Sequence, residues 1–223
     1  MLIKTLVEHS SFVVSLAVLQ NGNLASGSYD MTINVWNVKN GNLIRTLRGH
    51  TGFVLALAVL QSGYLASGSA DATIKIWNTE TGGLLTTLNG HSSDVLTLAV
   101  LKNGLLVSGG QDSLIKVWNP NSAGLVKNLT AHTNFVQSIL VFQSDLMASA
   151  GLDGAIKIWN CTNLTSSNFS TSTSTLKSTI GVANFTSSST RGVTTSTLTT
   201  RKTSTSTTTK IFTSTTKPTT TKP

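Results

Sequence analysis

The chain lacks several features that define whole classes of protein. It contains one cysteine, Cys161, which excludes an intramolecular disulfide framework, and it has no C-x-x-C motif or Cys/His cluster for a structural zinc site. No apolar run approaches the roughly 18 to 20 residues that a membrane helix requires. At the amino terminus, Glu8 and His9 interrupt the short apolar stretch, so we expect no signal peptide. These absences favour a reducing compartment, the cytoplasm first and the nucleus as the alternative.

Acidic residues are missing from the last part of the chain. Residues 1–160 hold nine Lys/Arg and eight Asp/Glu, whereas residues 161–223 hold seven Lys/Arg and no acid, so the net charge of +8 comes almost entirely from the tail. We therefore expect no nucleic-acid binding by the first part, where no basic cluster is evident. In the tail, 37 of 63 residues are Ser or Thr, which predicts that residues 166–223 are largely disordered.

The most informative positive feature is a polar quartet that returns four times at a spacing of 41 residues. Trp always follows His by 27 positions, and Asp always precedes Trp by six. The quartets use every His and every Trp of the chain: His9, Ser26, Asp30, Trp36; His50, Ser67, Asp71, Trp77; His91, Ser108, Asp112, Trp118; and His132, Ser149, Asp153, Trp159.

A period near 40 to 45 residues with these signatures resembles the WD40 repeat family of β-propellers. The resemblance implies an all-β fold of four four-stranded antiparallel blades over residues 1–165, in units of about 2–47, 48–88, 89–129 and 130–165. These blades are expected to form an open or incomplete ring. It also implies a structural tetrad in which Trp donates to Ser, Ser to His, and His to Asp. The residue after each Trp is Asn, never the Asp of the family signature, a departure with little expected structural cost.

Strand patterns agree with this resemblance. Within the second unit we expect strands over residues 53–60, 64–69, 73–78 and 84–88, because apolar residues alternate there and Gly-containing turns separate them. Residues 2–7 resemble the last strand of a unit and could complete the final blade. Four family-like blades span little more than half a circle, which leaves three alternatives: a fragment of a longer propeller, a tight four-blade ring, or self-association through the open ends.

A quartet of His, Ser and Asp also suggests a hydrolase triad. A catalytic site is normally assembled once, whereas this set is repeated in step with Trp, and no G-x-S-x-G motif is present. We therefore expect a buried structural network, no enzyme activity, no cofactor and no metal.

Binding residues are expected where loops of the blades vary between units. By resemblance to WD40 proteins, two sets of positions open on the top face, one three residues after each His and one directly before each turn Asp. Aromatic residues dominate them and favour a surface for other proteins or peptides. The predicted protein-binding residues are Phe12, Tyr29, Phe53, Asp94, Gln111, Phe135 and Leu152.

The function predicted from these features is a non-enzymatic protein-protein interaction scaffold. One alternative is a substrate-recognition or regulatory subunit of a larger complex, such as a ubiquitin ligase or a signalling assembly. The adaptor-docking Trp-Asp-x-Arg form is absent, however, so another subunit would have to supply that link. A second alternative is an extracellular glycosylated repeat protein, because Asn160, Asn163, Asn168 and Asn184 each begin an Asn-x-Ser/Thr sequon.

Overall fold

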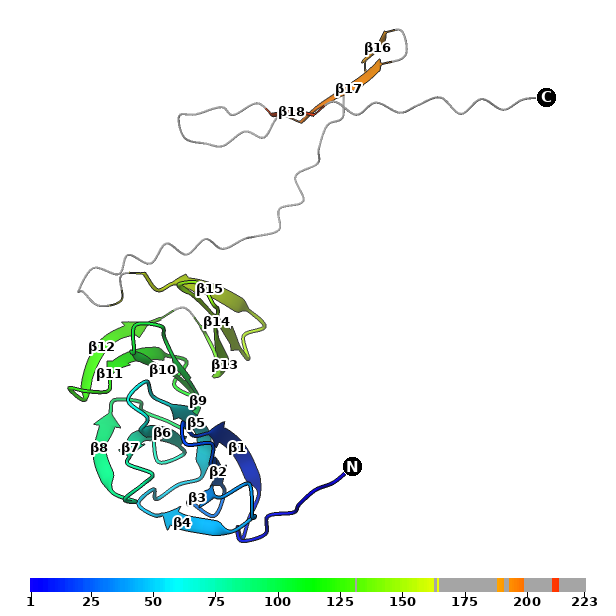
Figure 1. The fold of residues 1–223 in the computed structure, drawn as a ribbon. Coiled ribbons are helices and arrows are strands. Elements are labelled where there is room, and N and C mark those ends of the chain that lie inside the picture. The colour runs from blue at the N-terminus through cyan, green and yellow to red at the C-terminus, as the bar shows by residue number, and fades with distance from the viewer. Residues whose placement is uncertain (131, 163, 165–187, 191–192, 199–209, 213–223) are drawn as a thin grey trace. The chain divides into compact units, whose positions relative to one another are not determined.

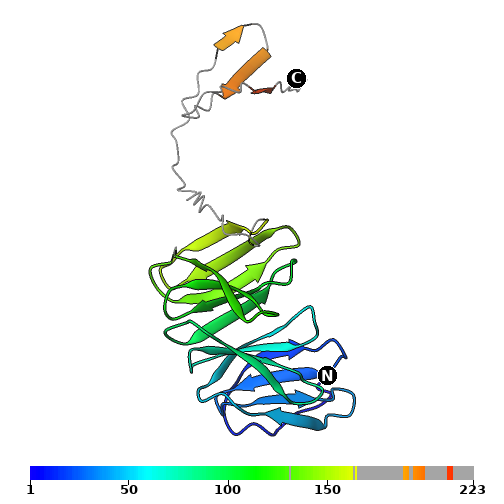
Figure 2. The same ribbon diagram turned by 90° about the vertical axis from the view of Figure 1, so that its left-hand side faces the viewer.

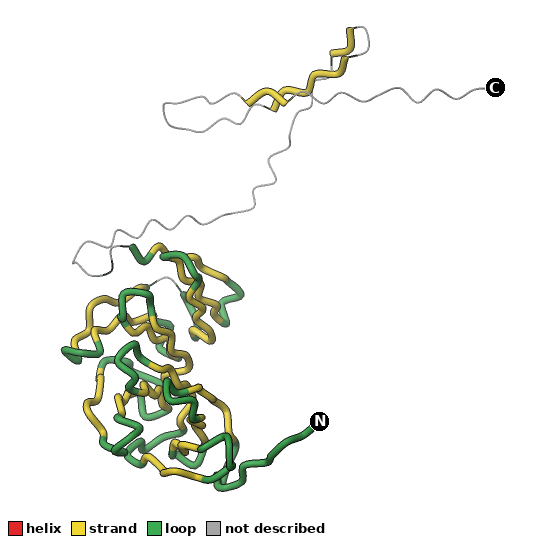
Figure 3. Tube along the Cα trace, viewed as in Figure 1, coloured by secondary structure: helices red, strands yellow, loops and turns green. Residues whose placement is uncertain are grey.

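The computed structural model describes residues 1–130, 132–162, 164, 188–190, 193–198 and 210–212. In these residues every regular element is a β-strand, and Figure 3 shows strands and loops without a helix. The chain divides into two units, residues 1–172 and 173–223. Among the described residues no helix is long and apolar enough to cross a membrane.

The first three repeats each form a four-stranded antiparallel sheet in which sequence neighbours pair. We call them blades 1, 2 and 3. Blade 1 holds β1 (Val13–Val18), β2 (Leu24–Ser28), β3 (Ile33–Trp36) and β4 (Leu43–Leu47). Blade 2 holds β5 (Val54–Val59), β6 (Leu65–Ser69), β7 (Thr73–Trp77) and β8 (Leu84–Asn89). Blade 3 holds β9 (Val95–Val100), β10 (Leu106–Gly110), β11 (Ile115–Asn119) and β12 (Gly124–Leu129).

Blade 4 has three strands in the described residues: β13 (Val136–Val141), β14 (Leu146–Gly151) and β15 (Ile156–Asn160). The position of its fourth strand, counted from the other blades, begins near residue 166 and lies outside the described residues. The all-β fold of antiparallel WD40-type blades predicted from the period is confirmed.

Two tight turns recur in the blades, and the local sequence explains both. Gly22, Gly63 and Gly104 have φ between 81° and 86° in the turns between the first two strands, where the sequence predicted hairpins. The residue after each tetrad Asp also has positive φ: 67° at Met31, 63° at Ala72, 64° at Ser113 and 74° at Gly154. Three of these four are not glycine, so the surrounding contacts must hold this turn in place.

The hydrophobic core consists of three clusters, each lying between two adjacent blades. Between blades 1 and 2, Ile33 and Val35 of β3 belong to one cluster with Trp77 of β7. The repeat places equivalent residues between blades 2 and 3, with Trp118, and between blades 3 and 4, with Trp159. Each cluster therefore draws on the facing sides of two adjacent blades.

A glycine in the second strand allows each pair of blades to approach closely. A Cβ on Gly27 would lie 2.7 Å from Cγ1 of Val54, and Gly68 and Gly109 stand in the same relation to the corresponding valines of the next blades. A side chain at these positions would push the following blade away. Blade 4 has Ala150 at the equivalent position.

The four blades follow one another along an arc whose first and last sheets lie at opposite ends (Figures 1 and 2). β1 contacts β5, β5 contacts β9, and β9 contacts β13. The strand predicted over residues 2–7 is wrong: these residues are in no strand, and Leu2 and Ile3 are 79% and 88% exposed. The physical reason is that this segment lies against blade 1 without joining a sheet, where the side chains of Leu6 and Val7 line a pocket with Val13 and Trp36.

The second unit contains three short strands, β16 (Ser188–Thr190), β17 (Val193–Leu198) and β18 (Lys210–Phe212), which pair in that order. The sequence predicted that residues 166–223 are largely disordered, and these twelve residues are the part of that range that the structure describes. The rest of residues 166–223 lies outside the described residues.

Candidate functional site

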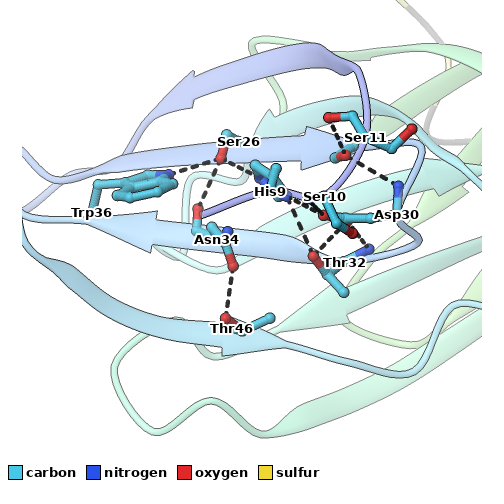
Figure 4. A network of polar contacts seen from close by, with 10 residues as sticks. His9, Ser10, Ser11, Ser26, Asp30, Thr32, Asn34, Trp36 and Thr46 are labelled. Atoms are coloured by element: carbon cyan, nitrogen blue, oxygen red, sulfur yellow. Dashed lines mark hydrogen bonds and ion pairs between the residues drawn. The ribbon is translucent and has the colours of Figure 1, made fainter. Parts of the chain in front are cut away.

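The repeated quartet of blade 1 forms a continuous hydrogen-bonded network (Figure 4). The indole Nε1 of Trp36 donates to Oγ of Ser26 at 2.8 Å, and Nε2 of His9 lies 2.7 Å from the same oxygen. At the other edge of the imidazole, Nδ1 lies 2.7 Å from Oδ2 of Asp30. The network links β3, β2, the segment before β1, and the turn between β2 and β3.

The other three blades repeat this geometry. In each, the Trp indole lies 2.8 Å from the Ser hydroxyl, and the His Nε2 lies 2.7 or 2.8 Å from it. The distance from His Nδ1 to the Asp carboxylate is 2.7 Å in blade 2, 2.8 Å in blade 3 and 3.0 Å in blade 4. All sixteen residues of the predicted tetrads therefore meet in groups of four.

The ionisation of these groups defines the direction of the hydrogen bonds. Burial raises the pKa of Asp71, but hydrogen bonds from Thr73, His50 and the Thr51 amide outweigh this effect and hold the pKa at about 2. Burial lowers the pKa of His50 below 6.5 despite the adjacent carboxylate. A neutral imidazole beside an ionised carboxylate donates from Nδ1 and accepts at Nε2, so Ser67 donates to His50 while it accepts from Trp77.

The same balance occurs in the neighbouring blades. Burial also lowers the pKa of His91. Burial acts to raise the pKa of Asp30, yet hydrogen bonds from Thr32 and His9 bring it to about 2. For Asp153 the hydrogen bond from His132 is the largest cause of a pKa of about 2.

The tetrads have further members that the repeated pattern did not identify. The hydroxyl groups of Thr32 and Thr73 donate to the tetrad Asp at 2.6 Å. The backbone amide after each tetrad His donates to the same carboxylate at 3.0 to 3.2 Å. Thr occurs two positions after the tetrad Asp in two of the four repeats, so the sequence could have revealed these two hydroxyl donors. Any residue type supplies a backbone amide, so the sequence could not have revealed the backbone donors.

The Asn after each Trp has a role in the turn that follows. The side-chain oxygen of Asn78 accepts hydrogen bonds from the amides of Glu80 and Thr81 at 2.9 and 3.1 Å. Asn37 and Asn119 make equivalent contacts. An Asp side chain offers the same acceptor, which explains why replacing the family's Asp by Asn costs the fold little.

The tetrad serine is poorly placed for nucleophilic chemistry. Ser67 and Ser108 are fully buried, and each hydroxyl is already shared between an indole and an imidazole. A substrate carbonyl would have to displace the Trp side chain to reach this oxygen. In the described part of the chain, no group of three or more His, Cys, Asp or Glu side chains could hold a metal ion.

The seven predicted protein-binding residues, together with Ala70, lie in pairs at the same end of each blade. The amide of the residue before each tetrad Asp donates to the carbonyl of the residue three positions after the tetrad His, at 2.9 Å in every blade. We call these eight residues the top rim: Phe12 with Tyr29, Phe53 with Ala70, Asp94 with Gln111, and Phe135 with Leu152.

The rim of blades 1 and 2 is a continuous aromatic cluster. The rings of Tyr29 and Phe53 stack with centroids 4.3 Å apart and planes 3° apart, although the two residues belong to different blades. Phe12 contacts Tyr29 edge to face at 5.8 Å. Phe12 is 73% exposed and Phe53 is 40% exposed, so part of each ring remains accessible to a binding partner.

The rim of blade 3 is polar, and that of blade 4 is apolar again. In blade 3, the amide nitrogen of Gln111 donates to Asp94 at 3.2 Å, and the Ser93 hydroxyl donates to the Gln111 oxygen at 3.3 Å. In blade 4, Phe135 is 36% exposed and Leu152 is 56% exposed. The rim thus presents an aromatic segment, a polar segment and a second apolar segment in the order of the blades.

Comparison with known proteins assigns the family. Residues 1–37, 41–78, 82–119 and 123–160 match the family described as WD domain, G-beta repeat. These matches cover more than half of the chain, and the protein belongs to the WD40 family. No protein of curated function matches the chain.

Solved structures agree with the family assignment. The structure of U3-55K is 28% identical and superposes with a TM-score of 0.67, covering 70% of this chain and 51% of that one. The crystal structure of the RRP9 WD40 repeats gives the same identity and TM-score, with 70% of this chain and 50% of that one covered. The chain therefore spans about half the length of these two structures.

Proposed function

We propose that the protein is a non-enzymatic scaffold that binds other proteins or peptides through the top rim. Membership of the WD40 family and the likeness to two WD40 structures support a role in protein interaction. The observation that carries the proposal is the exposed aromatic cluster of Phe12, Tyr29 and Phe53. Stacked aromatic side chains lose little conformational entropy when a partner covers them, and such residues dominate binding hot spots.

The partner expected at this rim carries apolar side chains for the two ends and a polar group for the middle. Phe12, Tyr29 and Phe53 offer apolar contact over blades 1 and 2. Asp94 and Gln111 offer a carboxylate and an amide beside them on blade 3. Phe135 and Leu152 resume the apolar surface on blade 4. An extended peptide or a loop with apolar residues on either side of a hydrogen-bond donor fits this order.

Two features support a scaffold rather than a catalyst. The tetrad serines are enclosed, and the repeated network is fully occupied in holding strands and turns together. The compartment proposed for this activity is the cytoplasm, with which the single buried free thiol of Cys161 is compatible. A recognition subunit of a larger complex would use the same rim.

A binding experiment with a matched control tests the proposal. Peptides selected from a random library on the native chain supply defined ligands, whose affinities are then measured for variants. Replacing Phe12, Phe53 and Phe135 by Ser should weaken binding at least tenfold. The control replaces three exposed apolar residues outside the rim, Val38, Leu85 and Val126, by Ser.

Both triple variants should remain folded, because none of the replaced side chains belongs to the buried core; the Phe variant also loses the stacking of Phe53 on Tyr29 and should melt at a somewhat lower temperature. Equal affinities for the native chain and the Phe variant, with folding intact, would reject the rim as the binding surface. A loss of affinity in the control variant alone would place the binding surface on the sides of the blades.

A further inference from the structure

The outer strand of a blade has two consistent functions in blades 1 to 3. Its last leucine is a core residue: Leu47, Leu88 and Leu129 are 1 to 2% exposed. The side chain of the residue before that leucine forms a hydrogen bond with a side chain of the third strand of the same blade. In blade 1, Thr46 donates to Asn34 at 2.7 Å. In blades 2 and 3 this contact joins Lys75 to Thr87 at 3.1 Å and Lys116 to Asn128 at 2.9 Å.

Blade 4 shows neither function within the described residues. Ile156 and Ile158 of β15 are 75% and 54% exposed, whereas the equivalent residues of blades 1 to 3 are at most 2% exposed. Lys157 is the counterpart of Lys75 and Lys116, and the described residues give its ammonium group no hydrogen-bond partner. Among the described residues, β15 is thus a strand edge with an apolar surface beside it.

The sequence that follows β15 is a poor outer strand. Counting 41 residues on from the outer strand of blade 3 reaches residues 166–170, which read Ser-Ser-Asn-Phe-Ser. Ser170 replaces the buried leucine of the other blades. Phe169 replaces the Thr or Asn that contacts the lysine, and its ring cannot accept that hydrogen bond.

A better outer strand is present elsewhere in the chain. Residues 2–6 read Leu-Ile-Lys-Thr-Leu, and β4 reads Leu-Ile-Arg-Thr-Leu. Leu6 corresponds to the buried leucine, and Thr5 corresponds to Thr87, the partner of Lys75. In the structure this segment pairs with no described strand, and Lys4 instead donates to the carbonyl of Lys39 in its own first blade.

From these observations we propose that residues 2–6 of one copy of the chain add to β15 of a second copy as the fourth strand of its blade 4. The first and last blades of one copy lie at opposite ends of the arc, so the segment meets this edge on another molecule (Figure 2). The register follows from β11 and β12, where Ile115 pairs with Leu129 and Lys116 with Asn128. It places Leu6 opposite Ile156 and Thr5 opposite Lys157.

Strand addition also brings together the two open faces. Val13 of the incoming copy is 49% exposed in the single chain, while its equivalents Val54, Val95 and Val136 are fully buried against the preceding blade. Docked on blade 4 of another copy, Val13 is covered in the same way.

Ala150 should weaken the contact between blade 4 and the incoming copy, and the size of this effect can be measured. Val13 would meet Ala150, where the other blades have glycine, and a Cβ on Gly109 would lie only 2.6 Å from Cγ1 of Val136. The incoming blade must therefore shift to accommodate the methyl group. Replacing Ala150 by Gly should strengthen the association severalfold, an effect that a nonspecific hydrophobic contact does not predict.

Light scattering over a concentration series is the first test. One copy has a mass of 23.4 kDa, and the native chain should approach twice that mass as its concentration rises. Leu6→Ser should remain a single copy. The control Leu85→Ser removes a leucine that is 49% exposed on the outer strand of blade 2, and it should associate as the native chain does. A native chain that stays a monomer throughout overturns the proposal.

Disulfide trapping tests the register. A chain with Thr5→Cys and Lys157→Cys should form covalent dimers under mild oxidation, because directly opposed Cβ atoms lie about 4.5 to 5.5 Å apart. Lys4→Cys with Lys157→Cys is the mismatched control, since neighbouring residues of a strand point to opposite faces. Burial raises the pKa of the Cys161 thiol to about 11, so this thiol stays protonated.

The outcomes separate the possible occupants of β15. Covalent dimers of the Thr5 and Lys157 pair alone support exchange between copies. A disulfide formed within one chain, or no disulfide in either pair because residues 165–187 of the same chain cover the edge, overturns the proposal.

Discussion

Replacing Asp71 by Ala is the most informative single perturbation of a blade. The carboxylate of Asp71 accepts four hydrogen bonds, from His50, from the Thr51 amide, and from both the amide and the hydroxyl of Thr73. The Thr51 amide is near solvent and can turn to water after the substitution. The Nδ1 donor of His50 is buried and has no other acceptor, and an unsatisfied buried donor costs about 1 to 3 kcal/mol.

The expected loss of unfolding free energy is therefore about 2 to 3 kcal/mol, once the weakened turn at Thr73 is included. For a domain of this size that loss lowers the melting temperature by roughly 4 to 12 °C. Urea unfolding followed by tryptophan fluorescence measures it directly, since all four tryptophans belong to the tetrads.

The control is Glu80→Ala, which removes the same charge from an exposed loop of the same blade. It should change the free energy of unfolding by less than about 0.5 kcal/mol. If Asp71→Ala unfolds at the same urea concentration as the native chain, the tetrad does not stabilise the blade.

Two further predictions concern blade packing and pH. Gly68→Ala should destabilise the protein by about 1 to 3 kcal/mol, because the new methyl group would lie 2.7 Å from Val95, whereas Gly83→Ala should have a small effect in urea unfolding. Stability should also fall in acid. The pKa of His50 is lower in the folded chain than in the unfolded chain, so below about pH 6.5 the unfolded chain binds a proton first and stability is lost. Asp30 and Asp71 have a pKa of about 2 in the folded chain against 3.8 in the unfolded chain, so further stability is lost from about pH 4 towards pH 2. A urea midpoint that is constant or rises from pH 7 to pH 3 would contradict the pH prediction.

Much of the fold could be read from the sequence because one period governs both the polar network and the strands. Strands of the second repeat were predicted over residues 53–60, 64–69, 73–78 and 84–88, and β5 to β8 begin and end within one residue of these limits. Alternating apolar residues and Asn-Gly or Ser-Gly turns depend on local conformation, so strands and hairpins can be predicted from them without information about the neighbouring blades.

Features that depend on contacts between blades were harder to predict. Glycine is required at Gly27, Gly68 and Gly109 because a valine of the next blade packs directly against each of them. This contact between blades cannot be deduced from a single repeat. Residues 2–7 have the pattern of an outer strand but form none in the structure, where Leu6 and Val7 lie against the face of blade 1 instead. The stacking of Tyr29 on Phe53 likewise joins two blades, and a pattern within one repeat cannot show it.

The structure separates two kinds of surface on this protein. The top rim is built by loops that vary between repeats while the tetrads beneath them stay the same, which suits recognition of a partner. The open faces at Val13 and at Ile156 arise instead from the repeat itself, because each blade requires a neighbour. Changes at the rim should therefore alter binding without altering association between copies, and changes at Leu6 should do the reverse.

Hydrogen exchange of the four indole N–H groups tests the central account most directly. Trp36, Trp77, Trp118 and Trp159 each donate this hydrogen to a tetrad serine and are at most 5% exposed. In two-dimensional proton-nitrogen spectra, all four indole signals should persist long after transfer to heavy water. Indole signals that vanish at the rate of free tryptophan, in a chain that is otherwise folded, would show that the repeated network does not hold the blades together.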